Sequence, residues 1–264
     1  MSAIEFTHVS RVFTRDGQGL LILDDINLTV HDKEFVAIVG PSGCGKTTCM
    51  RMAAGLEFPS TGSVTVSGKK VTEPGPERAV VFQQFALFPW KSVSDNIDFG
   101  LRGKGLPKPE RDQIIAHYID LMNLKGYESA YPHQLSGGMQ QRVAIARAYA
   151  LNPDALLMDE PFGALDAQTR VVMQEELVKL ARKNPRTVLF ITHAVEEAVY
   201  LADRVVIMTS RPGKIKEILD VKSVRESERW DQHQKIEDVM DLASFVHLRT
   251  RIWKSLREEH AGDH

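Results

Sequence analysis

Cysteines are scarce in this sequence, and long apolar runs are missing. The two cysteines, Cys44 and Cys49, are too few and too close together for a disulfide framework or a zinc cluster, which favours a reducing, cytosolic setting. The longest apolar stretches, such as Phe35–Val39, are strand length and far below the ~20 residues that span a bilayer. A signal peptide is not expected, because the opening residues lack its basic and long apolar regions. We therefore expect any membrane part of the function to come from another chain.

An excess of charge is also missing. Lys and Arg total 33 against 35 Asp and Glu, so the formal net charge is only −2. This balance gives no electrostatic argument for a nucleic-acid partner, and none is predicted. The length of 264 residues and the hydrophobic content of 43% are enough for one large domain, or two closely packed lobes, with a small appendage.

Short apolar runs alternate with helical patterns along much of the chain. The residues up to about 37 read as antiparallel β-strands joined by turns. After them, buried parallel strands are predicted at Phe35–Val39, 79–82, 155–158, 188–191 and 205–208. Helical patterns lie between several of these runs, so the fold class is α/β, with a parallel sheet flanked by helices.

Two segments depart from this alternation. From about 93 to 150 the sequence reads as helices without strands, most clearly at 110–124 and 139–151, and we interpret it as a helical lobe inserted into the sheet lobe. The main domain is expected to end near residue 220. A C-terminal tail, 221–264, is charged and predicted to form amphipathic helices docked on the body. Its apolar residues at helical spacing are Ile236, Val239, Met240 and Ala243.

A phosphate-binding loop is predicted directly after the strand at Phe35–Val39. Residues 40–47 read GPSGCGKT, a pattern whose glycines let backbone N–H groups turn toward phosphates, while the following helix adds its positive end. Lys46 is expected to reach the β and γ phosphates, and the Thr47 hydroxyl to ligate Mg²⁺. A chance glycine-rich turn is the alternative, but the strand–loop–helix context disfavours it. The predicted ATP-binding residues of this loop are Gly40, Pro41, Ser42, Gly43, Cys44, Gly45, Lys46, Thr47 and Thr48.

Two carboxylates follow the apolar run at 155–158, where α/β sheets place their ligands. Asp159 is expected to hold Mg²⁺ through water. Glu160 is the candidate general base that orients and polarises the attacking water. An ordinary strand end would show the same pattern, but the phosphate loop earlier in the chain makes that alternative poor.

A third motif suggests a family. The segment LSGGMQQR, from Leu135 to Arg142, together with the phosphate loop and the Asp–Glu pair, resembles the signature of ABC ATPases and implies their fold. Ser136 could simply cap a helix, but exposed N–H groups at a helix start also bind anions. In that family, Ser136, Gly137 and Gly138 would contact the γ-phosphate bound by the opposite subunit. The resemblance thus implies a second ATPase subunit, so that a homodimer, or a pair with a related chain as the alternative, holds two ATP molecules head to tail.

The resemblance assigns further roles. Phe13 stands where the family has an aromatic ring stacked on adenine, although an ordinary strand aromatic fits equally well. Gln83 matches a glutamine that touches Mg²⁺, with Gln84 the alternative by a shift of one residue. Asp166 lies in the loop that crosses to the other subunit. His193 matches the histidine that contacts the γ-phosphate. Catalytic roles are thus implied for Lys46, Glu160 and His193. The family often has Ser where Gly163 stands, and we expect little consequence from this departure.

The segment FALFPW, from Phe85 to Trp90, points to a branch of the family. The corresponding family surface receives a short helix of a membrane permease, although packing in the core would also explain these aromatic residues. The Pro–Trp pair, the Gly-Cys-Gly loop and the short tail resemble importers of nitrate, sulfonates and taurine. They imply a motor at the cytoplasmic face of the inner membrane, working with a permease and an external solute-binding protein. The motor of an exporter or lipid transporter, and a soluble ABC protein acting on ribosomes or DNA, remain alternatives.

Overall fold

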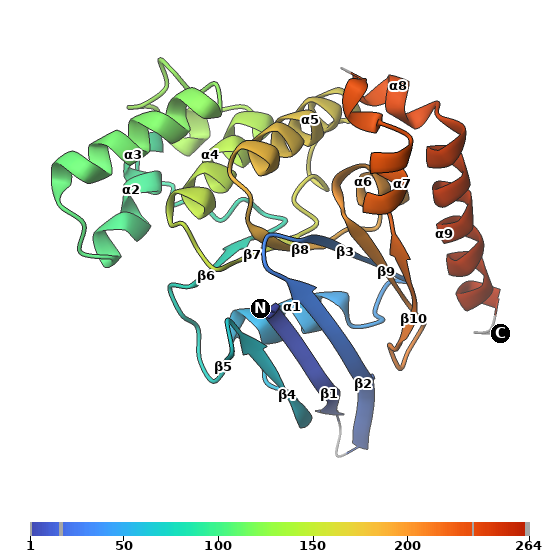
Figure 1. Ribbon diagram of the computed structural model, residues 1–264. Coiled ribbons are helices and arrows are strands. Elements are labelled where there is room, and N and C mark those ends of the chain that lie inside the picture. The colour runs from blue at the N-terminus through green and yellow to red at the C-terminus, as the bar shows by residue number, and fades with distance from the viewer. Residues whose placement is uncertain (1, 16–17, 234, 262–264) are drawn as a thin grey trace. The chain divides into compact units, whose positions relative to one another are not determined.

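A computed structural model describes residues 2–15, 18–233 and 235–261 (Figure 1). The chain forms two compact units. The first comprises Met1–Gly75 and Arg186–His264, and the second comprises Pro76–Pro185. Among the described residues, no helix combines the length and the apolar character needed to cross a bilayer.

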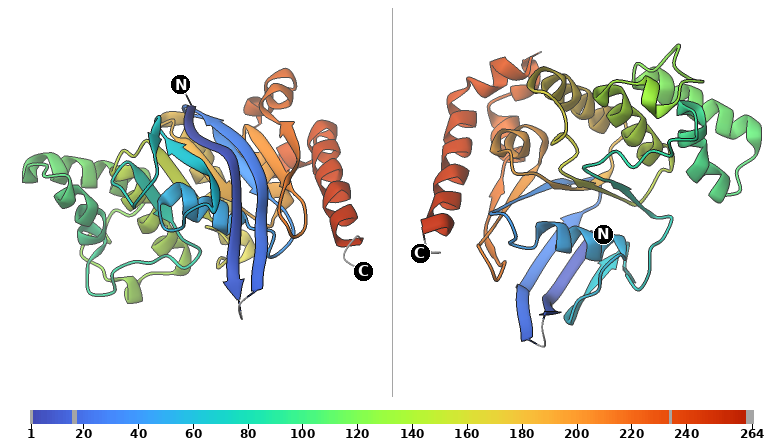
Figure 2. Two further views of the ribbon diagram at one scale, coloured as in Figure 1. Left: turned by 90° about the horizontal axis from the view of Figure 1, so that it is seen from below. Right: turned by 180° about the vertical axis from the view of Figure 1, so that it is seen from behind.

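An antiparallel sheet begins the first unit. Its strands are β1 (Ser2–Arg15), β2 (Gln18–His31), β4 (Thr61–Val66) and β5 (Lys69–Lys70), in the order β2-β1-β4-β5. The long β1–β2 hairpin is clearest in Figure 2. Alternate residues such as Ile4 and Phe6 are buried along one face of β1, as expected for a sheet that covers a core on one side only. The predicted antiparallel portion is therefore confirmed.

The first unit also contains a run of neighbouring parallel strands. Its members are β3 (Phe35–Val39), β8 (Thr187–Ile191) and β9 (Arg204–Met208), and the antiparallel β10 (Ile215–Asp220) extends it. β3 lies between β8 and β9 and is parallel to both, and β10 pairs with β9. Every residue of β3 and β8 is buried, because neither face of these strands is left to solvent. The predicted strands at these positions are confirmed.

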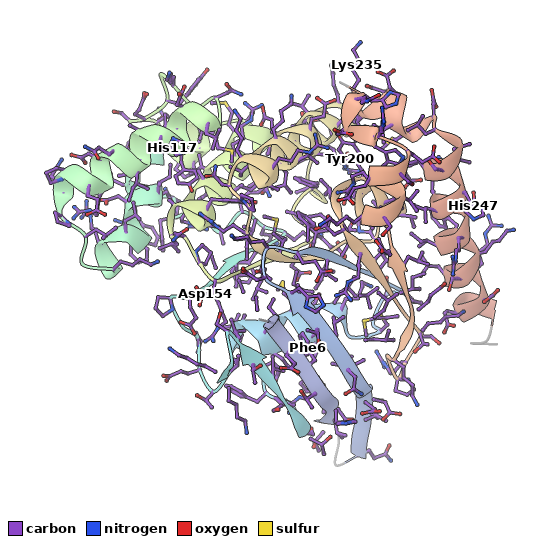
Figure 3. All side chains as sticks on the ribbon, in the orientation of Figure 1. Phe6, His117, Asp154, Tyr200, Lys235 and His247 are labelled. Atoms are coloured by element: carbon purple, nitrogen blue, oxygen red, sulfur yellow. The ribbon has the colours of Figure 1, made fainter. Side chains whose placement is uncertain are left out.

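Helices complete the first unit. They are α1 (Lys46–Ala54), α6 (Val195–Leu201), α7 (Lys222–Ser227), α8 (Ile236–Met240) and α9 (Ala243–Ala261), with a 3-10 turn at Trp230–Gln232. α8 and α9 pack on α6, and α9 also packs on β9. Phe245 of α9 is fully buried, with its ring centroid 5.6 Å from that of Trp230. His247 lies on the exposed side of the same helix (Figure 3).

The second unit joins one strand pair to four helices. The strands β6 (Arg78–Val81) and β7 (Ala155–Asp159) pair in parallel. The helices are α2 (Val93–Gly103), α3 (Lys108–Leu121), α4 (Gly137–Ala150) and α5 (Ala167–Lys183), with a 3-10 turn at Pro132–Gln134. Residues 93–150 are all described, and they contain no strand. α4 packs against α2, α3, α5 and β6, which makes it the central helix of this unit.

The predicted helices at 110–124 and 139–151 are both present, and each begins two residues earlier than expected. α3 starts at Lys108 because Pro109 is compatible with the first helical turn, and Asn123, with φ 52°, ends the segment in a left-handed conformation. α4 starts at Gly137 because Ser136 caps it. The predicted start at 110 did not use the signal of Pro109, and the one at 139 did not use the cap that the sequence analysis had considered at Ser136.

Candidate nucleotide-binding site

The phosphate loop has a backbone that requires glycine at two positions. Gly43 and Gly45 have φ of 78° and 100°, in the left-handed region that residues with side chains rarely adopt. Gly45 also caps the start of α1, and a Cβ atom there would lie 2.4 Å from Cδ2 of Leu23 on β2. Conformation and space therefore both demand glycine at position 45.

The start of α1 is suited to an anion. No described side chain caps this helix, and its first turn contains no acidic residue, so its first N–H groups keep their partial positive charge. Burial raises the pKa of the neighbouring thiols of Cys44 and Cys49, that of Cys49 to about 12. Both thiols are thus neutral near pH 7 and add no negative charge beside the loop.

Lys46 lies against the phosphate loop itself. Its side chain is buried, and Nζ donates to the carbonyl oxygens of Gly40 and Pro41 at 2.7 and 2.8 Å. Sγ of Cys44, a weak acceptor, is 3.8 Å from the same nitrogen. An ammonium binds phosphate oxygens more strongly than neutral carbonyls or thiols. The charge is therefore held at the loop by bonds that a phosphate group can replace.

His193 leaves the sheet at the same edge as the phosphate loop. Ile38 of β3 pairs with Ile191 of β8, and the N–H of Thr192 donates to Ile38 O at 3.3 Å. Because these strands are parallel, the residues after them lie at one edge. The turn carrying His193 is fixed by Thr192, whose hydroxyl donates to Glu197 at 2.5 Å and accepts from the N–H of Ala194 at 3.0 Å.

Gln83 and Glu160 are brought together in the second unit by the same rule. Val81 of β6 pairs with Met158 of β7, and Gln83 and Glu160 each lie two positions after their residue of this pair. Nε2 of Gln83 lies 3.4 Å from Oε2 of Glu160. This contact supports Gln83 over Gln84 as the site residue. Asp159 is the last residue of β7.

Gly163 leaves room for this contact. A Cβ atom at position 163 would lie 3.2 Å from Nε2 of Gln83, which is closer than most contacts of real Cβ atoms. A serine there would require the Gln83 amide, the far end of a flexible side chain, to shift by a few tenths of an ångström. That this glycine has little consequence stays a prediction, and the close approach to Gln83 is a feature that the sequence does not reveal.

The signature segment forms the start of α4. The Ser136 hydroxyl accepts from the N–H of Met139 at 3.3 Å, and Ser136 and Gly137 are exposed. A Cβ atom at Gly137 would meet nothing nearer than 3.8 Å, whereas one at Gly138 would lie 2.5 Å from Thr169 Cγ2. The first turn of this helix, like that of α1, contains no acidic residue. An anion can therefore approach the helix start from the open side at Gly137.

Asp166 caps α5. Its Oδ1 accepts from the N–H of Thr169 at 3.0 Å. Hydrogen bonds from Thr169, the backbone one above all, lower the pKa of this exposed carboxyl group, so it is charged near neutral pH. α5 is tied to α4 by Arg142, whose guanidinium donates two hydrogen bonds to Glu176 at 2.9 and 2.8 Å. Through this ion pair, a residue of the signature segment joins α4 to the middle of α5.

Phe13, the predicted adenine-stacking residue, is half-buried on β1. The guanidinium carbon of Arg11 lies 4.3 Å from its ring centroid, and Arg11 also pairs with Glu57 at 2.5 Å. Arg11 therefore covers one face of the ring, which leaves only the other face for a base.

The predicted site residues are divided between the two units. Phe13, the phosphate loop and His193 belong to the first, and the others belong to the second. Those of the second are Gln83, Ser136, Gly137, Gly138, Asp159, Glu160 and Asp166.

Comparison with known proteins identifies the family. The family described as ABC transporter matches residues 23–163. An uncharacterized ABC transporter ATP-binding protein of Methanocaldococcus jannaschii, MJ0412, is 52% identical over 256 residues, which cover 97% of this chain and 92% of that protein. The chain belongs to the ABC transporter family.

Two further similarities describe this ABC protein more closely. The nitrate import ATP-binding protein NrtD of Synechocystis sp. is 46% identical over 83% of this chain and 82% of that protein. The dimeric ATP-binding cassette MJ0796, solved in a post-hydrolysis state with ADP and Pi, has a TM-score of 0.71 at 29% identity, over 83% of this chain and 98% of that chain. The protein is an ATP-binding ATPase subunit, of a kind that dimerises and works with membrane permeases.

An aromatic surface lies on the second unit of the ABC protein. The ring of Phe88 is 4.4 Å from that of Phe99 and 5.7 Å from that of Trp90, measured between centroids. Trp90 is 71% exposed. Two cations border the cluster: Arg147, 5.7 Å from the Phe88 ring, and Lys91, 5.6 Å from the Phe99 ring. Phe99 was not singled out in the sequence analysis. The available signal was its position three residues after Asn96 in a predicted helical segment, which places the two residues on the same side of a helix.

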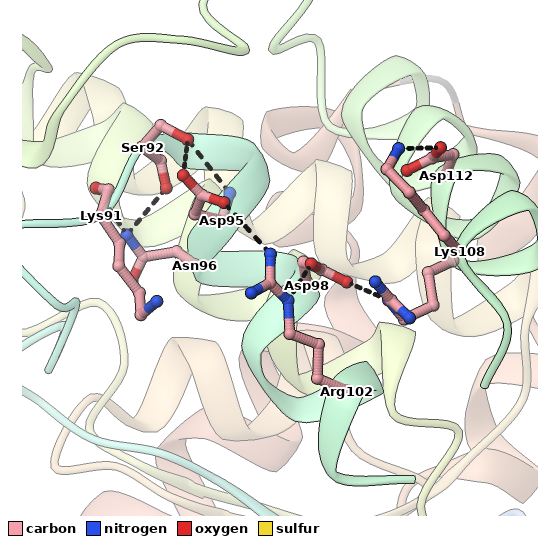
Figure 4. A network of polar contacts seen from close by, with 9 residues as sticks. Lys91, Ser92, Asp95, Asn96, Asp98, Arg102, Lys108 and Asp112 are labelled. Atoms are coloured by element: carbon pink, nitrogen blue, oxygen red, sulfur yellow. Dashed lines mark hydrogen bonds and ion pairs between the residues drawn. The ribbon is translucent and has the colours of Figure 1, made fainter. Parts of the chain in front are cut away.

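Buried polar groups hold this surface in place. Asn96 is fully buried, accepts from the N–H of Phe88 at 2.9 Å and donates to the carbonyl of Lys91 at 3.0 Å. Two residues further along α2, the carboxylate of Asp98 accepts from Arg102 of α2 at 2.5 Å and from Arg111 of α3 at 2.6 Å (Figure 4). Asp98 therefore ties α2, which carries Phe99, to α3.

Asp98 remains charged despite its burial. Burial raises its pKa, but the hydrogen bonds and charges of Arg102 and Arg111 outweigh this effect and leave the pKa below its ordinary value of 3.8. A group with a lowered pKa stabilises the fold above its ordinary pKa, and this stabilisation is lost as the pH falls through the folded value.

Asp98→Asn should lower the free energy of unfolding by about 2 kcal/mol near neutral pH, because two arginines lose a charged acceptor. Asp112→Asn is the matched control, since Asp112 forms an exposed pair with Lys108 at 2.6 Å and should change stability by less than about 1 kcal/mol. Urea unfolding measures both. The loss in Asp98→Asn should shrink as the pH is lowered from about 5 toward 3. Equal effects of the two substitutions, or a pH-independent loss, would contradict this account.

Proposed function

We propose that the protein is the ATP-hydrolysing motor subunit of a bacterial importer for a small solute of the nitrate, sulfonate or taurine kind. Its similarity to NrtD over most of both chains is the observation that carries the proposal. The aromatic surface of Phe88, Trp90 and Phe99 supports it, because a motor that drives a permease needs a docking surface for it. On this proposal the protein lies at the cytoplasmic face of the inner membrane, and an external solute-binding protein delivers the solute to the permease.

In the proposed nucleotide site, the N–H groups of the phosphate loop and Lys46 hold the phosphates, and a base stacks on Phe13. Mg²⁺ would be held by the Thr47 hydroxyl, the Gln83 amide oxygen and, through water, Asp159. These oxygen atoms suit Mg²⁺, which usually takes few protein ligands beside water and phosphate. Only the oxygen of the Gln83 amide can ligate a cation, and it is the nitrogen that contacts Glu160, so the two contacts use different atoms. The bound ion would neutralise phosphate charge.

Glu160 is the proposed general base, and His193 the proposed contact to the γ-phosphate. Glu160 follows the end of β7, and its backbone φ of 45° turns the chain sharply after the strand. The carboxylate would orient a water molecule for in-line attack on the γ-phosphate and accept its proton. The Gln83 amide beside it can hold the carboxylate in this orientation.

A second copy of the chain would complete the site. The open approach at Gly137 and the capped start of α4 would bind the γ-phosphate held by the other subunit, and Asp166 would lie at the crossing between the subunits. ATP then favours the closed dimer because only that arrangement contacts the γ-phosphate from both sides. This differential affinity is the source of the force on the permease.

Glu160→Gln should bind ATP with nearly unchanged affinity and hydrolyse it on the order of 10²–10⁴ times more slowly, because the amide cannot accept the proton from water. Glu110→Gln, an exposed substitution on α3 of the same unit, is the matched control and should keep normal turnover. Calorimetry measures the affinity, and phosphate release measures the turnover. A Glu160→Gln protein with near-normal turnover would remove this residue from the role of base.

The permease is proposed to dock on the aromatic surface formed by Phe88, Trp90 and Phe99. Exposed aromatic rings bordered by cations are suited to anchoring a partner helix. Trp90→Ala should therefore release the protein from its permease while leaving ATP binding intact, because Trp90 lies outside the nucleotide-binding residues.

Affinity purification from solubilised native membranes, followed by mass spectrometry, tests this docking. Trp253→Ala is the control, since Trp253 is also exposed but lies on α9 of the other unit. We expect a multi-spanning permease to accompany the wild type and Trp253→Ala, but not Trp90→Ala. A solute-binding protein in the same sample supports import, and a permease that works in export or lipid transport would replace the importer assignment. Ribosomal or DNA-repair proteins without a permease would contradict the transport role.

A further inference from the structure

The turn between β9 and β10, residues 209–214, packs directly against the phosphate loop within the first unit. A Cβ atom at Gly213 would lie 1.9 Å from the carbonyl oxygen of Cys44, and one at Gly40 would lie 3.1 Å from Cβ of Met208. Two glycines, one on each side, therefore allow the backbones to meet. No sequence motif marked this contact, because the two segments are far apart in the chain.

Hydrogen bonds fix the turn in this position. The N–H of Gly213 donates to Ile22 O at 2.8 Å, and Gly213 O accepts from the N–H of Asp24 at 3.0 Å. The Thr209 hydroxyl accepts from the N–H of Lys214 at 2.9 Å and donates to Pro212 O at 3.0 Å, which closes the turn. The tail contributes as well, because Glu259 of α9 accepts from the N–H of Ser210 at 3.1 Å.

The turn places a cation beside the phosphate loop. Nη2 of Arg211 is 3.1 Å from the point where a Cβ atom of Gly43 would stand. Arg211 is exposed, and in the described part of the chain no carboxylate pairs with it. The other cation of the turn, Lys214, differs in this respect, since it pairs with Asp24 at 2.7 Å. Lys46 differs too, because it is buried and bonded to carbonyls of the loop.

We propose that Arg211 is a second phosphate-binding cation of the nucleotide site, which contacts the terminal phosphates from outside the loop. The inference rests on the proposed role of residues 40–48 as the phosphate loop. A guanidinium group matches phosphate oxygens with two parallel N–H donors. The Arg211 side chain is exposed and therefore able to adjust, while its backbone is fixed by the turn. Its position beside Gly43, an exposed part of the loop, brings its charge within reach of the phosphates.

The number of phosphates on the nucleotide should decide how much Arg211 contributes. A cation that contacts the terminal phosphates acts strongly on ATP, less on ADP and hardly at all on AMP. A residue that only supports the shape of the loop would affect every nucleotide that the loop binds. Salt provides a second criterion, because the attraction between an exposed cation and phosphate is screened.

The test is calorimetric titration of the full chain with ATP, ADP and AMP. Arg211→Ala should weaken ATP binding about tenfold and ADP binding less, and leave AMP binding within about twofold, since a hydrogen bond to a charged group is lost. Arg211→Lys should restore most of the ATP affinity, and Lys214→Ala should behave as wild type. Arg211→Ala should also show a weaker dependence of ATP affinity on salt, and a raised KM for ATP with kcat little changed.

Two results would overturn the role of Arg211. One is unchanged ATP affinity in Arg211→Ala, and the other is an equal loss for all three nucleotides, which would assign the turn a supporting role only. Lys46→Ala separates this inference from the proposed function. If Lys46→Ala loses ATP binding while Arg211→Ala keeps it, the phosphate loop stands and Arg211 does not. If Lys46→Ala binds ATP as tightly as wild type, the proposed loop fails, and the role of Arg211 fails with it.

Discussion

The backbone of the phosphate loop is the constraint on which the site depends. Its left-handed residues, Gly43 and Gly45, hold the chain open at the start of α1, so that N–H groups remain available to phosphates instead of being capped by a side chain. This shape is unfavourable for an isolated chain. It is held by what surrounds it: a fully buried strand before it, Leu23 against Gly45, and the Gly213 backbone against Cys44.

The register of the parallel strands places the other candidate catalytic residues. β3 and β8 deliver the phosphate loop and His193 to one edge within the first unit. β6 and β7 deliver Gln83 and Glu160 to one edge within the second. Helix starts then supply the anion-binding ends, at Gly45 and at Ser136. Local rules of strand pairing and helix capping thus account for most of the geometry within each unit.

These local rules also explain how much could be predicted from the sequence. The strand Phe35–Val39 was predicted to the residue because it is wholly apolar and ends at a glycine. A helix after the phosphate loop was expected because the motif stands between a strand and a helix. The starts of α3 and α4 were misplaced by two residues, since the pattern of apolar residues is weaker than the signals of Pro109 and Ser136. Phe99 was missed although its place on the same predicted helical segment as Asn96 was a usable signal. The position of Arg211 and the approach of Gly163 to Gln83 could not be predicted, because they depend on segments that meet only in the folded chain. The roles of Ser136 and Asp166 toward a second subunit rest on family resemblance.

The central claim is that two chains complete the nucleotide site, and sedimentation of Glu160→Gln with saturating ATP or ADP tests it most directly. The account predicts a dimer with ATP and a monomer with ADP, because slow hydrolysis keeps the γ-phosphate that joins the subunits. Gly137→Asp in the same background should remain monomeric, since a carboxylate would lie beside the partner's phosphate, whereas Gly103→Asp, where a Cβ atom would meet nothing within 4 Å, should still dimerise. A protein that binds ATP yet remains monomeric, or that dimerises equally with ATP and ADP, would contradict the account.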